Sequence, residues 1–301
     1  MEGSTMGVSK KHILQQGPVI RSFLSAAAAA LTQKPSSGLD TPTALLHRTV
    51  PPRDRAMVRD YVKWTGGSSA SYKNVLPSHL FPQWGFPLIA KTLDGIPYDM
   101  KKVLNGGCRI EINGPLPSGE PLIMEACLQS IDDNGRRAVL KQRLVTGTAS
   151  SPNALVTYGY AIVPTGQREP GAAKPKKKER PRVPDNAREI ARRKLHPNSG
   201  WEFALLTGDF NPVHWVRPYA KAAGFRNCIL HGYGTLAIAI EALNKVQFSG
   251  DASRLQTIDV KFVRPLVLPQ TVGVYVLGTG EIFVGDHPGG PAYMTGVFTH
   301  G

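Results

Sequence analysis

An acid, an amide and an imidazole fall within six residues of this chain, at Asp209, Asn211 and His214. A carboxylate beside an imidazole, whose pKa is ordinarily about 6.5, forms an acid–base pair suited to neutral pH. Asn211 is a favourable N-cap and Pro212 fits the first helical position, so we expect a short helix to begin there. Asp209 then lies just before that helix and His214 lies in its first turn, so both side chains can point into one space.

A second motif follows 17 residues after His214, where His231-Gly232 opens an apolar segment. The run from Tyr233 to Asn244 is rich in Leu, Ile and Ala, which predicts a largely buried helix. The free N–H groups at its start, near Gly232, could stabilise a developing thioester enolate oxygen. Together the two motifs suit the addition of water to, or its removal from, a carbon next to an activated carbonyl.

The combined pattern resembles the signature of a known family. Thr-Gly-Asp-x-Asn-Pro-x-His at 207–214 is followed by Gly-Phe at 224–225 and by Leu-His-Gly at 230–232. This order is similar to that of the MaoC-like hydratase-2 family, and Arg-Pro-Leu at 264–266 fits as well. The resemblance implies a hotdog fold. It also implies activity as an (R)-specific enoyl-thioester hydratase or a (3R)-hydroxyacyl-thioester dehydratase.

The same resemblance assigns roles to individual residues. Asp209 and His214 become the catalytic pair, Asn211 supports them by hydrogen bonding, and Gly232 provides the oxyanion-hole amide. We expect no metal and no cofactor, because hydrogen bonds and a helix end activate the carbonyl, and the sequence has no evident metal-ligand cluster. The side chains expected to contact the substrate are His231, Phe225, Tyr233 and Trp84.

Each motif also has a simpler interpretation when taken alone. Asp209 and Asn211 are ordinary turn and cap residues, and His214 could be a structural surface histidine. Gly-x-Gly-x-x-Ala at 232–237, with Asp251 further on, formally matches a dinucleotide-binding fingerprint, although the segment before it is too short for a convincing strand. A hotdog acyl-thioesterase and a non-catalytic acyl-CoA-binding subunit are the alternative functions. The joint spacing favours the hydratase.

Composition limits the class of protein. A length of 301 residues suggests two domains, and three cysteines without a CxxC pair indicate a reducing compartment. No apolar run reaches the roughly 18 residues that a membrane span needs. A net charge of +14 favours anionic partners, and we expect the thioester of coenzyme A or of an acyl-carrier protein, not nucleic acid. We expect a cytoplasmic location, with a mitochondrial one as the alternative because residues 1–45 are poor in acids.

We predict four segments along the chain. Residues 1–45 hold a helix from Val19 to Thr32 that packs on the body, and residues 46–165 form a degenerate first hotdog. The Lys/Pro-rich stretch 166–183 reads as an extended linker, with a basic patch for a partner as the alternative. Residues 184–301 form the catalytic second hotdog.

The two halves read as a diverged repeat. Residues 62–67 echo residues 204–209, and the segments 110–116 and 122–127 echo 260–266 and 272–277. Each half should hold an early helical segment, a buried helix and then antiparallel strands, which is an α+β double hotdog that acts as a pseudo-dimer, either monomeric or as a homodimer. The first half lacks the chemistry, because Gly67 stands in place of Asp209 and Tyr72 in place of His214. Its helix near residues 80–87 carries two prolines, so it should start late or bend, and its aromatics either fill the core or shape an acyl pocket.

Overall fold

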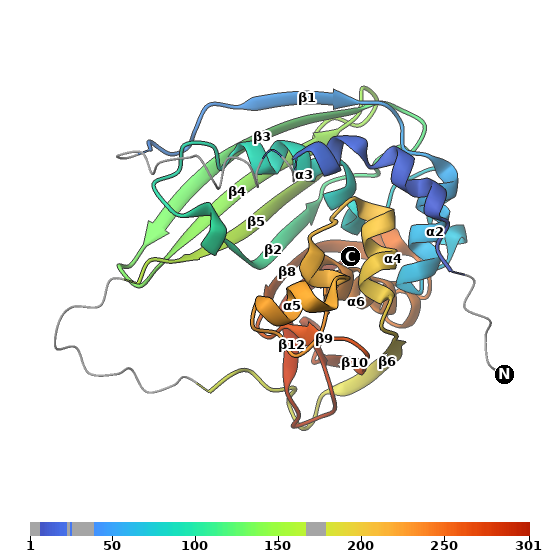
Figure 1. Cartoon of the computed structure of the whole chain (residues 1–301). Helices are drawn as coiled ribbons and strands as arrows, with labels where there is room; N and C mark the ends of the chain where they lie inside the picture. The colour runs from blue at the N-terminus through green and yellow to red at the C-terminus, as the bar shows by residue number, and fades with distance from the viewer. Residues whose placement is uncertain (1–6, 23–24, 26–38, 167–178) are drawn as a thin grey trace.

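The computed structural model describes residues 7–22, 25, 39–166 and 179–301, which form an N-terminal segment and two halves that share one sheet (Figure 1). The first half contains β1 Leu46–Val50, α2 Arg55–Thr65, η2 Ser69–Tyr72, η3 Ser78–Leu80, α3 Pro82–Lys91, η4 Met100–Lys102, β2 Leu104–Ile112, β3 Leu122–Asp133, β4 Arg137–Gly147 and β5 Leu155–Pro164. The second half contains β6 Arg188–Leu195, α4 Ser199–Thr207, η5 Pro212–His214, α5 Arg217–Ala222, β7 Ile229–Leu230, α6 Gly232–Val246, η6 Ala252–Arg254, β8 Leu255–Phe262, β9 Leu266–Val267, β10 Gln270–Leu277, β11 Glu281–Gly285 and β12 Ala292–His300.

One ten-stranded antiparallel sheet joins the halves in the order β1-β3-β4-β5-β2-β8-β12-β11-β10-β6. Counted from the two edges toward the middle, the first half contributes β1, β3, β4, β5 and β2. The second half contributes β6, β10, β11, β12 and β8 in the equivalent positions. The seam is the β2–β8 pair, in which Ile110 lies opposite Ile258 and Cys108 lies opposite Val260. This mirrored order confirms the predicted repeat, because each half contributes an equivalent five-stranded unit that meets the other at the same strand.

Local hydrogen bonds repeat as well. Thr65 and Thr207 each donate their hydroxyl to the carbonyl of the residue four positions earlier, near the C-termini of α2 and α4. Both helices then end at a glycine in the left-handed region, Gly66 with φ 92° and Gly208 with φ 84°. Only glycine adopts this conformation without strain, so the sequence stops both helices at the same point. Position 67 therefore corresponds to Asp209, as the sequence indicated.

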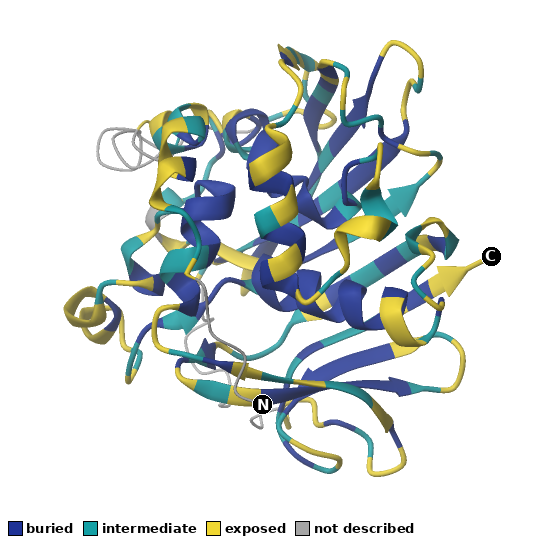
Figure 2. Cartoon of the chain, turned by 90° about the vertical axis from the view of Figure 1, so that its right-hand side faces the viewer, coloured by how far each residue is buried: buried dark blue, intermediate teal, exposed yellow. Residues whose placement is uncertain are grey.

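The central helices of the two halves differ in regularity. α6 runs without interruption for 15 residues, and twelve of them are buried. In the first half a single 3-10 turn, η3, precedes α3, which starts at Pro82 and contains Pro87. This late start confirms the expectation from the two prolines. Figure 2 shows buried residues concentrated where the helices face the sheet, and one hydrophobic cluster there spans both halves.

Two strands depart from the expected order of elements. Each half was expected to open with a helical segment, whereas each opens with an edge strand, β1 or β6. The sequence of β6, Arg-Glu-Ile-Ala-Arg-Arg-Lys-Leu, is too charged to indicate a strand, but an edge strand tolerates such side chains because one side is solvated. The dinucleotide-binding alternative is wrong, since β7 has two residues and pairs antiparallel with β9 instead of entering a parallel sheet.

The N-terminal segment packs on the body, as expected. Its residues 17–22 are helical, and most of the predicted helix beyond them lies outside the described residues. Gln16 donates its amide to the carbonyl of Leu205, and Val19 is buried. The predicted linker also lies mostly outside the described residues, but its last residue, Val183, is buried against the second half. Among the helices of the described residues, none is long and apolar enough to span a bilayer.

Candidate active site

Asp209 lies in the short loop between α4 and η5. The left-handed turn at Gly208 ends α4 and directs the chain inward, so the carboxylate is largely buried. Burial raises the pKa of Asp209, and the nearby His214 and an N–H···O bond from Asn211 (3.3 Å) act in the opposite direction. Asn211 caps η5 by accepting from the N–H of Val213. The sequence therefore predicted both the position of this helix and its capping residue.

His214 ends η5 with a defined tautomer. Its Nδ1 lies 2.8 Å from the carbonyl oxygen of Ile229, and because a carbonyl only accepts, Nδ1 carries the hydrogen. Nε2 is then the basic nitrogen. Burial lowers the pKa of His214, so the ring is neutral at neutral pH and ready to accept a proton. Gly200 of α4 makes room for this turn, because a Cβ there would clash with the backbone of His214.

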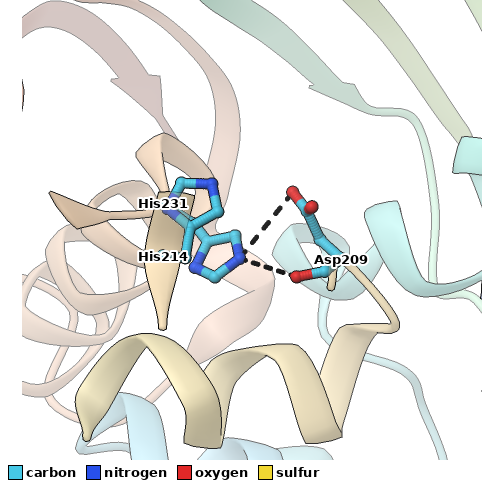
Figure 3. A group of neighbouring side chains, drawn as sticks. All are labelled: Asp209, His214 and His231. Atoms are coloured by element: carbon cyan, nitrogen blue, oxygen red, sulfur yellow. Dashed lines mark hydrogen bonds and ion pairs between the residues drawn. The ribbon is translucent and has the colours of Figure 1, made fainter. Parts of the chain in front are cut away.

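His231 completes the cluster by stacking on His214. The ring centroids are 3.5 Å apart and the planes differ by 23° (Figure 3). The Nε2 of His231 donates to the backbone carbonyl of Asp209 at 2.9 Å and lies 3.8 Å from its carboxylate. Burial, followed by the charge of His214, places the pKa of His231 well below the usual value. His231 was expected to contact substrate. In the structure it supports both members of the acid–base pair.

The chemistry of this cluster fits proton transfer better than metal binding. Asp209, His214 and His231 each place a potential ligand atom within 4.8 Å of the others. However, one nitrogen of each ring already donates to a carbonyl. A neutral imidazole beside a buried carboxylate is instead an arrangement for general acid–base catalysis.

The oxyanion-hole candidate is the N-terminus of α6. Its N-cap is His231, and the first N–H groups bonded within the helix are those of Gly234 and Thr235, which donate to the carbonyl of His231. The N–H of Gly232 precedes this ladder, so it can donate to a ligand. A Cβ at position 232 would lie 2.6 Å from the ring of Phe262, so this position requires glycine.

The other residues expected to contact substrate are spread around the cluster. Phe225 packs behind η5 with Val213 and Cys228. Tyr233 is buried on α6, and its ring contacts those of Phe81, Phe86 and Phe262 edge-on. The charge of Asp209 is among the causes that raise the pKa of Tyr233, after burial, whereas the described contacts of Phe225 do not include the catalytic pair.

Trp84 lines a cavity of about 540 Å³ in the first half. Val19 lines the same cavity and also touches Gly208, because a Cβ at Gly208 would lie 2.6 Å from Val19. Val19 therefore lies between the cavity and the residue before Asp209. Its apolar walls are completed by Val50, Met57 and Pro87.

Several residues at the site carried no recognisable sequence signal. Gly200 looks like any helical glycine, and Val19 lies far away in sequence. Phe203 packs its ring against His231 at 4.8 Å, but in the sequence it is one apolar residue of a helix.

Comparison with known proteins relates the second half of the chain to a known family. Residues 176–287 match the family model described as the MaoC like domain. Over 199 residues the chain is 28% identical to the peroxisomal enoyl-CoA hydratase 2 of Arabidopsis thaliana. The matched region covers 60% of this chain and 61% of the Arabidopsis protein. The chain thus spans less than two thirds of that relative's length.

Two solved structures share the fold. The MaoC-like dehydratase of Phytophthora capsici superposes with a TM-score of 0.67 at 22% identity, covering 87% of this chain and 96% of the other. A Mycobacterium tuberculosis protein described as a double hotdog fold superposes with a TM-score of 0.55 at 12% identity, covering 87% and 96%. The fold of this chain is a double hotdog, as the repeat predicted.

Proposed function

We propose that this chain catalyses the reversible hydration of a trans-2-enoyl thioester to an (R)-3-hydroxyacyl thioester, a reaction supported by the match of residues 176–287 to the MaoC like domain. One observation carries the proposal. A buried carboxylate, a neutral imidazole and the free end of a buried helix meet at Asp209, His214 and Gly232. The name of the Arabidopsis relative, an enoyl-CoA hydratase, supports the same reaction. The R configuration follows from the family resemblance.

In the hydration direction the acid–base pair acts on water. The carboxylate of Asp209 and the Nε2 of His214 accept hydrogen bonds from one water molecule and orient it. As the water oxygen bonds to C3 of the enoyl group, one of its protons passes to this pair, and the C2–C3 π electrons move toward the thioester carbonyl. His214 suits the acceptor role because its lowered pKa keeps Nε2 unprotonated at neutral pH.

The helix end stabilises the charge that develops. The thioester oxygen becomes enolate-like, and the N–H of Gly232 donates to it at the positive end of α6. The enolate then takes a proton at C2 from the acid–base pair, which restores the carbonyl and returns the pair to its starting state. Water is consumed, no redox change occurs, and the reverse sequence is the dehydration.

We assign the acyl chain to the cavity lined by Trp84. Its volume of about 540 Å³ lies in the range of small-molecule pockets, and its walls combine apolar residues such as Val19, Val50 and Met57 with the charged Arg48, Arg53 and Asp54. The carrier is coenzyme A or an acyl-carrier protein, for which the net charge of +14 is favourable. The compartment stays a prediction, cytoplasmic or mitochondrial.

The deciding experiment follows crotonyl-CoA with two readouts, loss of enoyl absorbance and release of free thiol. The proposal expects absorbance loss without thiol and a chiral product of R configuration. Thiol release would identify a thioesterase instead, and neither signal with a short or a long enoyl-CoA would indicate a binding subunit.

A chain-length series tests the assigned cavity. Trp84→Leu should change KM for long enoyl-CoA substrates while leaving crotonyl-CoA nearly unaffected, because the proposal assigns only the distal part of a long acyl chain to the cavity. An equal effect on both lengths would remove the acyl chain from this cavity.

A further inference from the structure

A second buried acid–imidazole pair occupies the place in the first half that corresponds to the active site. There, position 67 is glycine and position 72 is tyrosine, so the half supplies neither the acid nor the imidazole at these positions. The carboxylate comes instead from Glu241, in the middle of α6 of the second half. It fills the space beside Gly67, where a Cβ would clash with it.

The carboxylate of Glu241 is held by donors from the first half. The Nε2 of His79 lies 3.1 Å from Oε1, and both side chains are almost fully buried, with 0% and 3% exposure. The hydroxyl of Tyr72 accepts from Asn244 at 2.8 Å and also hydrogen-bonds Glu241. These contacts tie α6 to the first half with a charged group that has left water, so they are sensitive to the loss of either partner.

The hydroxyl of Tyr61 fixes the other side of His79. It lies 3.0 Å from Nδ1 of His79 and donates to the carbonyl of the same residue at 2.9 Å. The charge of Glu241 contributes to a pKa of Tyr61 that burial already raises well above its usual value, so this hydroxyl stays protonated and remains a donor. His79 is thereby held in one orientation toward Glu241.

Two physical routes connect this cluster with the proposed active site. The first is α6 itself, since Gly232 precedes Glu241 by nine residues, about 13.5 Å along one continuous helix. The second is a series of packed rings. Tyr61 contacts Phe203 at 6.2 Å, and Phe203 contacts His231 at 4.8 Å.

We infer that Glu241 is a positioning residue, which fixes α6 against the first half and thereby sets the Gly232 N–H relative to Asp209 and His214. The inference rests on the proposed hydratase function. It explains why the acid absent at position 67 reappears on the helix of the other half. The place in the first half that corresponds to the active site thus serves as an attachment point for the oxyanion helix.

The first test compares Glu241→Ala with Glu241→Gln, using exposed Glu281→Ala on β11 as the matched control. Glu241→Ala should lower kcat for crotonyl-CoA by about 10- to 100-fold, since small misplacements of positioned groups have effects of that size. KM and the Kd for a non-reactive thioether analogue should stay within about twofold. Glu241→Gln keeps an acceptor for His79, so it should recover most of kcat. Wild-type kcat in folded Glu241→Ala would overturn the inference.

The second test moves the carboxylate off the helix. Gly67→Asp alone should lower Tm, because the new side chain meets Glu241. In Gly67→Asp with Glu241→Ala, the buried carboxylate returns but is no longer attached to α6. Tm should then recover toward wild type while kcat stays low. Recovery of both would show that Glu241 only fills space. If Glu241→Ala does not fold, this double variant is compared with Glu241→Gln instead.

A readout without turnover separates this inference from the proposed function. The ring-proton NMR signals of His214 and His231 report the geometry of the site directly. They should shift in Glu241→Ala and keep their wild-type positions in Glu241→Gln and Glu281→Ala. Wild-type signals in folded Glu241→Ala would overturn the inference even if the enzyme is active. If Glu241→Ala shows these shifts but the wild-type protein hydrates no thioester, only the proposed function is overturned.

Discussion

The rings of His214 and His231 stack at a centroid distance of 3.5 Å, and each ring gives one N–H to a different backbone carbonyl. Burial lowers the pKa of both rings, and the charge of His214 lowers that of His231 further, to well below the usual value. Burial therefore keeps His214 neutral, with Nε2 free to take a proton from water.

Stability should fall as the pH is lowered below about 6.5, the ordinary histidine pKa. The unfolded chain takes up protons on His214 and His231 in this range, whereas the folded protein resists protonation because both pKa values are lowered. The raised pKa of Asp209 acts with the opposite sign, because protonation of this carboxyl above its ordinary pKa of 3.8 favours the folded state. Thermal melts from about pH 8 to about pH 5 measure the slope. His231→Gln should reduce it, and an unchanged slope would mean that His231 charges in the folded state.

Asp209→Asn and His214→Gln should each abolish most hydratase activity, with a loss on the order of 10²–10⁴ in kcat. Each variant removes one member of the pair that activates water, and neither changes side-chain size appreciably. Circular dichroism and Tm verify folding, and exposed Asp132→Asn provides the matched control. Near wild-type turnover in either folded variant would remove that residue from the mechanism.

Each chain should bind one substrate analogue. Only the second half presents a carboxylate and an imidazole at the corresponding positions, and the space in the first half is filled by Glu241. Calorimetric titration with a non-reactive thioether of an enoyl-CoA should give a stoichiometry of one. A stoichiometry of two equivalent sites would contradict the degenerate-repeat interpretation.

Gly232→Ala should reduce kcat by about 10²–10³, the range found when one oxyanion-hole donor is lost. The added Cβ would lie 2.6 Å from the ring of Phe262, so the helix end or the ring must move. Phe262→Leu gives the new methyl group room, and the double variant should regain part of the lost kcat. Gly232→Ala retains this N–H but displaces it, so wild-type kcat in the folded variant would mean that turnover does not depend on the position of the N–H.

Much of the fold was readable from the chain because its signals are local. The left-handed glycines at 66 and 208, the Asn-Pro start of η5 and the apolar run of α6 each specify an element within a few residues. The repeated order of these signals predicted two similar halves, and the sheet confirms them. The edge strand β6 escaped prediction because its charged sequence is permitted by its place at the edge, which sequence alone does not reveal.

The sequence by itself determined which residues could carry out the chemistry, since Asp209, Asn211 and His214 share one turn and Gly232 opens the next helix. Only the tertiary structure decided what supports them. The stacking of His231 on His214 and the entry of Glu241 into the space beside Gly67 join elements that are distant along the chain. Such contacts depend on how two helices and a sheet pack, and packing is set by the whole core instead of by any local pattern.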